Sequence, residues 1–238
     1  MDDDWESMGA ERISELPTVR QWPRLSNHTR MVEMFSEMGV LGSAPLHDAL
    51  LRSSRGYHSL PLPSDIGDVN IETSALRMPW WKDVSVHQSL LPGLYETIQV
   101  LQALDIRQGD DVLIIGPRGN WWTEIAMQLG ARRIRVVGTI EERLAELRSR
   151  WASLRLDQAA EALGCEIEWR VVGSHRDARP PAGWDRILIT GGLSEAPMSI
   201  METMARGGCA ILPVLEDSGT MLQSVRWTDG GFMAQRMA

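Results

Sequence analysis

Two glycines and a glutamate follow apolar segments that have the pattern of buried strands. Gly116 and Gly119 come directly after residues 112–115, and Glu141 comes shortly after residues 134–138. Glycine lets the main chain approach a ligand without interference from a Cβ atom. A carboxylate placed just after a strand suits the vicinal hydroxyls of a ribose, as in dinucleotide-binding folds. Glu141 also suits the first turn of a helix, where the helix dipole favours negative charge. We favour the ribose interpretation because of the position after the strand.

Short apolar segments alternate with helical patterns from residue 111 onward. This alternation predicts βαβ units and an α/β fold with a doubly wound sheet, in which ligands bind at the carboxyl ends of the strands. Strands are expected at 112–115, 134–138, 166–172, 185–190 and 209–214, followed by an antiparallel hairpin of 222–227 and 232–237. Helices are expected at 93–104, 122–129, 141–163 and between strands four and five, with earlier helices within 30–51 that are broken near 39–45.

The chain divides into three parts by composition, within one structural domain. Residues 1–29 form an acidic N-terminal arm, and residues 30–92 contain N-terminal helices and an irregular segment rich in Pro, Gly and Ser. Residues 93–238 form the Rossmann-like core. A long irregular segment in a compact domain is typically functional or disordered.

The composition argues against several classes of protein. The formal net charge of -8 argues against nucleic acid as a partner, because phosphate contacts need a basic surface. No apolar run approaches the roughly 20 residues that cross a bilayer, so no membrane is expected as a partner. The acidic N-terminus has no pattern of an export signal. Two cysteines make neither a disulfide framework nor a zinc cluster, which favours a cytoplasmic protein. A monomer is favoured.

Three stretches of the sequence resemble the protein-L-isoaspartate O-methyltransferase family. The most specific comprises 183–192, Pro197 and 206–214, the second is 112–126, and the third lies within 31–55. The resemblance covers roughly residues 30–237, with the blocks in the order of the family. It implies a class I methyltransferase Rossmann-like doubly wound sheet of seven strands with an N-terminal helical extension. It also implies S-adenosylmethionine as the methyl donor, and a protein or peptide substrate with an abnormal aspartyl carboxylate.

The resemblance implies specific residues for the two substrates. Those for the donor are the loop residues Gly116, Arg118, Gly119 and Asn120, the ribose-binding Glu141, and Gly173, Ser174 and His175 beside the adenine. For the methyl acceptor, Ser85 or Ser89 in the segment 84–92 stands in for the family's serine, and the alignment does not choose between them. A carboxylate acceptor is already ionised at neutral pH, so the reaction depends on positioning rather than on a general base.

Four positions depart from the family's pattern. Arg118 and Asn120 replace glycines, Ile114 replaces an acidic residue, and Ser174 replaces aspartate. These changes favour an alternative, a catalytically degenerate scaffold that binds a partner, whereas Glu141 and the strand order favour the enzyme. A third alternative is a methyltransferase for another acceptor, RNA or a small molecule, and the acidic balance argues against RNA. We expect an S-adenosylmethionine-dependent methyltransferase that acts on a carboxylate of a protein or peptide.

Overall fold

A seven-stranded sheet forms the centre of the protein, and its strand order is β3-β2-β1-β4-β5-β6-β7. The computed structural model describes residues 28–53, 94–117, 119–138, 140–171, 180–190, 193, 196–216 and 219–237. The first five strands are parallel, and β6 and β7 are antiparallel to their neighbours. The strands are β1 (Asp111–Ile115), β2 (Arg133–Gly138), β3 (Glu166–Val171), β4 (Trp184–Ile189), β5 (Met204–Glu216), β6 (Gly219–Thr228) and β7 (Gly231–Arg236). The predicted class of fold is confirmed.

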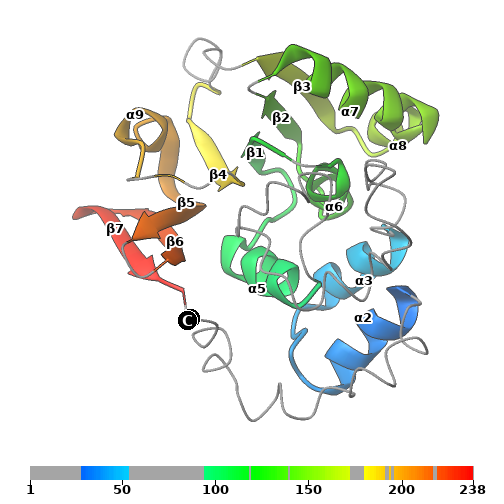
Figure 1. Ribbon diagram of the computed structural model, residues 1–238, viewed down its shortest axis with the longest axis horizontal. Coiled ribbons are helices and arrows are strands. Elements are labelled where there is room, and N and C mark those ends of the chain that lie inside the picture. Colours follow the sequence, from blue (N-terminus) through cyan, green and yellow to red (C-terminus); the bar gives the residue numbers. More distant parts are fainter. Residues whose placement is uncertain are drawn as a thin grey trace.

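Most of the described helices lie on one side of the sheet, and only the short α9 lies on the other (Figure 1). They are α2 (His28–Glu37), α3 (Ala44–Arg52), α5 (Leu94–Leu104), α6 (Trp121–Gln128), α7 (Glu141–Ser153), α8 (Leu156–Ala162) and α9 (Met198–Met201). The predicted separation of the first two helices near residues 39–45 is confirmed. Ser43 caps α3, because its side chain accepts a hydrogen bond from the backbone N–H of Leu46 at 3.4 Å.

The inner strands are apolar throughout because both of their faces are covered. In β1, Val112 and Ile114 pack with the larger group of helices, whereas Leu113 packs into the core on the side of α9. The exposed fractions of all three are at most 1%, so alternation between polar and apolar residues is absent from this strand. Ile114 is therefore an ordinary core residue at the position where the family has an acidic one.

The predicted helix 141–163 is interrupted, which corrects the sequence-based expectation. Arg155 adopts a left-handed backbone conformation with φ 57°, and it separates α7 from α8. Trp151 is the last buried residue of α7, and the next one is Leu156, five positions further on. Five residues at about 100° each turn a side chain well away from the buried stripe. The interruption brings Leu156 and Ala160 back onto the sheet.

The C-terminal hairpin lies at the edge of the sheet, as predicted. Thr228 pairs with Gly231 across the turn, and Trp227 packs against Phe232 with ring centroids 5.3 Å apart. β7 is largely exposed along its length. The strand before the hairpin, β5, is longer than the expected 209–214, because it already begins at Met204.

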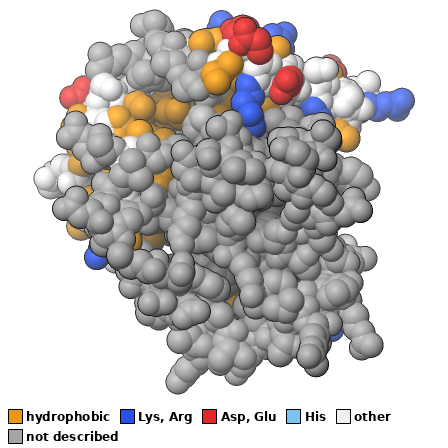
Figure 2. All heavy atoms as spheres, in the orientation of Figure 1, with side chains coloured by type: hydrophobic (Ala, Val, Ile, Leu, Met, Phe, Trp, Pro, Cys, Tyr) orange, Lys and Arg blue, Asp and Glu red, His pale blue; other side chains and the backbone are white. Residues whose placement is uncertain are grey.

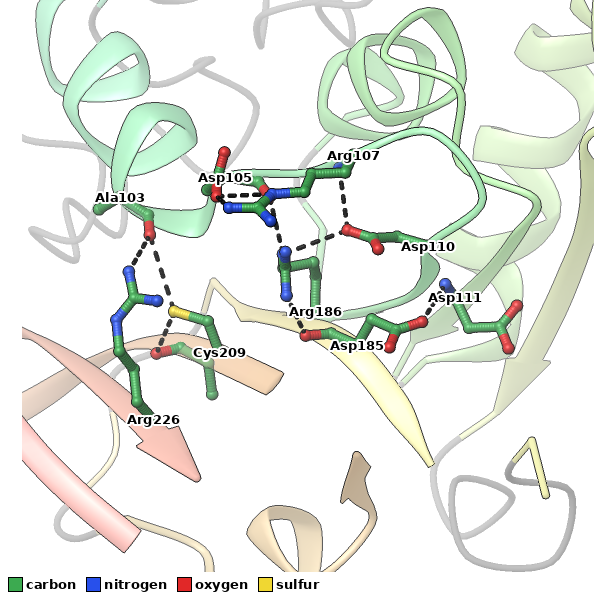
Figure 3. Close-up of polar contacts among 10 residues, drawn as sticks. Ala103, Asp105, Arg107, Asp110, Asp111, Asp185, Arg186, Cys209 and Arg226 are labelled. Atoms are coloured by element: carbon green, nitrogen blue, oxygen red, sulfur yellow. Dashed lines mark hydrogen bonds and ion pairs between the residues drawn. The ribbon is translucent and has the colours of Figure 1, made fainter. Parts of the chain in front are cut away.

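The amino ends of β1 and β4 are closed by a cluster of charged residues (Figure 3). The Nε atom of Arg186 donates to the backbone oxygen of Asp105 at 2.9 Å and lies 3.2 Å from a carboxylate oxygen of Asp110. A side-chain oxygen of Asp185 accepts the backbone N–H of Asp111 at 2.8 Å. Burial raises the pKa of Asp110, against the lowering effects of the backbone N–H of Arg107 and of the Arg186 charge.

Charged side chains of both signs occur on the visible part of the described surface. Along the upper edge of Figure 2, acidic and basic side chains are interspersed with apolar ones. No helix in the described part of the chain combines the length and the apolar character needed to span a membrane.

Candidate functional site

The carboxyl ends of β1 and β2 meet at Gly116, the first residue after β1. Its φ is 70°, a left-handed conformation that glycine adopts without steric cost. Its backbone N–H donates to the oxygen of Val137 in β2 at 2.8 Å. The turn after β1 is therefore held against the end of β2, and the glycine at this position is required by the backbone itself.

Thr190, the residue after β4, closes this turn from the other side. Its backbone N–H donates to the oxygen of Ile115 at 3.0 Å, and its hydroxyl donates to the oxygens of Ile115, at 3.1 Å, and Gly116. The exposed fraction of Thr190 is only 2%. This residue was not among the predicted site residues. The sequence signal was its place at the end of a strand, within the block 183–192 that resembles the family.

Asn120 occupies a position where the family has glycine, and it does so without backbone strain. Its φ is -85° and its ψ is -3°, so the left-handed conformation that would favour glycine is absent. The side chain is fully buried, and its Nδ2 atom donates to the backbone oxygen of Leu147 in α7 at 2.7 Å. Its Oδ1 atom has no hydrogen-bond partner within the part of the chain that the structure describes. A neutral hydrogen bond contributes about 1 kcal/mol, whereas an unpaired buried acceptor costs about 1–3 kcal/mol. The net effect of this amide on stability is therefore small or unfavourable.

Glu141 is the first residue of α7, at the same edge of the sheet as Gly116. It is exposed, and it follows Ile140, whose apolar side chain is 55% exposed and cannot cap the helix. The start of α7 lies close to β2, because a Cβ atom on Gly138 would lie only 3.2 Å from the Cδ1 atom of Leu144. The exposed carboxylate of Glu141 and the exposed side chain of Ile140 thus lie at the same edge of the sheet as the turn that contains Gly116.

The helices of the N-terminal region are attached directly to α6. Ser53, the residue after α3, accepts a hydrogen bond on its backbone oxygen from Nε1 of Trp121 at 2.9 Å. Its hydroxyl donates to a carboxylate oxygen of Glu124 at 2.7 Å. All three residues are at least nine-tenths buried. Ser53 therefore lies next to the first turn of α6, the helix for which Asn120 is the N-cap residue.

The structure brings together part of the predicted donor site. Gly116, Gly119 and Asn120 lie in the turn between β1 and α6, and Glu141 lies at the adjacent end of β2. Gly119 is buried. The other predicted site residues lie outside the described residues: Arg118, Gly173, Ser174, His175, Ser85 and Ser89. Their roles stay predictions.

A sequence model of one protein family matches this chain over residues 77–238. Its description is protein-L-isoaspartate(D-aspartate) O-methyltransferase (PCMT). The chain belongs to this family. The match begins at residue 77, before α5. It includes the turn at Gly116, Glu141 and Thr190.

Similar proteins carry the same description. The chain is 27% identical over 212 residues to a protein-L-isoaspartate O-methyltransferase of Methanopyrus kandleri, which covers 87% of this chain and 85% of the relative. It is 30% identical over 195 residues to one of Rhodospirillum rubrum, with 82% and 80% coverage.

A solved structure shares the fold. It is that of a Plasmodium falciparum protein described as a protein-L-isoaspartate O-methyltransferase in complex with S-adenosyl-L-homocysteine, and it aligns with a TM-score of 0.63 at 12% identity. The alignment covers 89% of this chain and 94% of the solved one. The predictions of family, fold, S-adenosylmethionine-dependent methyltransferase and methyl donor are confirmed, and the degenerate scaffold is not favoured.

Proposed function

We propose that this protein transfers the methyl group of S-adenosylmethionine to the carboxylate of an isoaspartyl residue in a protein or peptide. The observation that carries the proposal is the family match over residues 77–238, which includes the whole turn between β1 and α6. The names of the relatives from Methanopyrus kandleri and Rhodospirillum rubrum support this substrate class. We propose protein repair in the cytoplasm as the setting, which agrees with two cysteines that are both free and buried.

The described residues fit an adenosine-containing donor. The main chain at Gly116 is free of a Cβ atom at the carboxyl edge of the sheet, where ligands of such folds bind. The exposed carboxylate of Glu141 provides two acceptor oxygens for the ribose hydroxyls. The exposed side chain of Ile140, directly before it, provides an apolar surface for a purine. Ser85 or Ser89 would contact the methyl acceptor.

The chemistry requires alignment rather than proton transfer. The donor supplies a methyl group on a positively charged sulfur, which leaves as a neutral thioether when the methyl carbon is attacked. The attacking carboxylate oxygen is ionised at neutral pH, since its ordinary pKa is near 4. The task of the protein is therefore to hold the two reactants in line. The hydrogen bonds that fix the turn at Gly116 serve this task, because they hold the main chain in one conformation before the donor arrives.

Two of the four departures from the family pattern are compatible with this function. Ile114 is part of the core, and Asn120 directs its amide to α7. Neither side chain needs to displace a donor from the turn. Arg118 and Ser174 lie outside the described residues, so a direct binding measurement is needed.

Calorimetric titration with S-adenosylmethionine and S-adenosylhomocysteine tests the donor site. We expect saturable binding at micromolar concentrations, and no binding at millimolar donor would refute the proposal. Methyl transfer is then compared between a peptide with an isoaspartyl residue and its twin with a normal aspartyl residue. Transfer to the isoaspartyl peptide alone is expected. A protein that binds the donor but methylates neither peptide would act on another acceptor.

A pair of adjacent glutamates tests the ribose contact. Glu141 and Glu142 are both exposed in the first turn of α7, so Glu141→Gln and Glu142→Gln remove the same charge from the same helix end. A hydrogen bond to a charged group contributes about 1.5–3 kcal/mol, so we expect Glu141→Gln to raise the donor Kd about 10-fold or more. Glu142→Gln is expected to leave it unchanged. Equal, small effects of the two substitutions would instead indicate only a helix-dipole interaction.

A further inference from the structure

One buried hydrogen bond connects the turn after β1 with the helix that carries Glu141. It joins Nδ2 of Asn120 to the backbone oxygen of Leu147, over 27 positions of sequence. We propose that Asn120 is a positioning residue, which sets the place of Glu141 relative to the turn at Gly116 and thereby the affinity for the methyl donor. This inference rests on the proposed function, and it assigns Asn120 a role through α7 instead of contact with the donor.

The geometry of α7 explains how a contact at Leu147 controls Glu141. The helix runs from Glu141 to Ser153, and a rise of 1.5 Å per residue places Leu147 about 9 Å along the axis from its first residue. Near its start, the helix lies against β2 through Leu144, whose side chain covers Gly138. One contact fixes the start of the helix and the other fixes the next turn. Together with the packing of Trp151 against Trp169 further along the helix, they set the direction of α7 and the location of its first carboxylate.

A side-chain cap from the residue before α7 does not replace these two contacts. The residue before the helix, Ile140, makes no side-chain capping bond. Its apolar side chain is exposed and cannot accept a backbone N–H. The packing of Leu144 and the bond from Asn120 therefore both contribute to the position of the first turn of α7.

Stability alone does not account for the amide at position 120. The bond to Leu147 is offset by the Oδ1 atom, which is buried and has no hydrogen-bond partner among the described residues. Leaving a buried acceptor unpaired costs at least as much as one neutral hydrogen bond contributes. The side chain also makes no capping bond to α6, so its removal takes no cap away from that helix. A buried polar group with an unfavourable balance is expected where it has a functional task.

The substitution Asn120→Ala tests this role, with Ser53→Ala as the matched control. Both residues are fully buried and both make contacts near the start of α6, but the hydrogen bonds of Ser53 beyond α3, within the described part of the chain, go to α6 and not to α7. We expect Asn120→Ala to raise the Kd for S-adenosylhomocysteine and the KM for S-adenosylmethionine about 5- to 10-fold, with kcat changed less than 2-fold and little change in Tm. Ser53→Ala is expected to lower Tm and leave the donor Kd within 2-fold.

A double-mutant cycle identifies the route of the effect. If Asn120 acts through Glu141, then Glu141→Gln raises the donor Kd much less in the Asn120→Ala protein than in the wild type. Independent, additive effects of the two substitutions would overturn the inference. An unchanged donor Kd together with a lower Tm for Asn120→Ala would also overturn it, because the bond would then be only structural. Failure of the wild-type protein to bind any donor would instead refute the proposed function itself.

Discussion

The amino and carboxyl ends of the parallel strands are held by different kinds of interaction. At the amino end, Arg186 and Asp110 form a largely buried ion pair, and carboxylates and guanidinium groups bond to the backbone of adjacent segments (Figure 3). At the carboxyl end, the turn at Gly116 is held by backbone groups and by the hydroxyl of Thr190. Charged groups at the amino end thus bond to adjacent segments of the protein, whereas the carboxylate of Glu141 at the carboxyl end is exposed.

This comparison indicates that the ion pair between Arg186 and Asp110 serves the architecture of the sheet. A buried charge needs a fixed partner, and once paired it is not available to a ligand. A site that binds a charged, diol-containing donor needs polar groups that are not already hydrogen-bonded within the protein. We therefore expect substitutions at the amino end to change stability alone, and matched substitutions at the carboxyl end to change donor binding as well.

The largest effect is expected from Arg186→Met. Its side chain is only 10% exposed, and its removal leaves Asp110 without its cation, which costs about 3 kcal/mol of unfolding free energy. The donor Kd should stay the same, and urea unfolding with calorimetric titration measures both quantities. Arg107→Ala, which removes a 70% exposed side chain beside the same cluster, should lower the stability far less, because solvent screens an exposed ion pair.

The Arg186→Met protein should also respond differently to pH. Burial already raises the pKa of Asp110, and the pKa rises further without the Arg186 charge. A carboxyl group with a raised pKa in the folded state stabilises the protein at low pH and loses this contribution as the pH rises through that value. The stability difference between variant and wild type should therefore grow from pH 4 to pH 7. A difference independent of pH would show that Asp110 does not carry the effect.

The substitution Gly116→Ala should have the next largest effect. A residue with a Cβ atom in the left-handed conformation costs about 1–2 kcal/mol, and a shift of the turn should raise the donor Kd about 10-fold. Gly164→Ala is the control, because Gly164 has φ 67°, open space around its Cα atom and a place just before the amino end of β3. The two variants should lose similar stability, and only Gly116→Ala should bind the donor more weakly. Equal donor affinities would contradict the assignment of this turn to the donor.

A smaller effect is expected from Thr190→Val. The substitution removes the hydroxyl bonds to the backbone at Ile115 and Gly116, at a cost of about 1 kcal/mol. Thr203→Val removes a comparable buried bond, 2.6 Å from the Thr203 hydroxyl to the oxygen of Ile200, away from the turn. The Tm of thermal unfolding should be lower in both variants than in the wild type. Calorimetric titration should detect weaker donor binding in Thr190→Val alone.

The smallest effect concerns Cys165, which lies directly before the amino end of β3. Burial raises the pKa of its thiol from 9.0 to about 11, so we expect slow reaction with thiol reagents at pH 8. In the unfolded state the thiol ionises at lower pH than in the folded state. Stability should therefore fall as the pH rises from 9 to 11, and less so in Cys165→Ala. Rapid labelling of the folded protein at pH 8 would contradict this interpretation.

The sequence by itself determined the order of the strands along the chain and the class of ligand, although it predicted one helix where the structure has α7 and α8. Apolar runs bounded by turn residues located the strands, because a strand buried on both faces must be apolar throughout. The glycine after β1 and the glutamate after β2 were found for the same reason, since both stand at fixed places relative to those strands. The family resemblance then named the donor, and the family match confirmed it.

Only the tertiary structure decided how these residues are held. Thr190 contacts Gly116 across 74 positions of sequence. This contact exists because β4 lies beside β1 in the sheet, although β2 and β3 separate them in the chain. The bond from Asn120 to Leu147 depends on the placement of α6 and α7 side by side on β2, and the alignment had assigned Asn120 only to the glycine turn. Contacts between segments distant in sequence depend on the strand order, and a periodic pattern of single residues carries no record of that order.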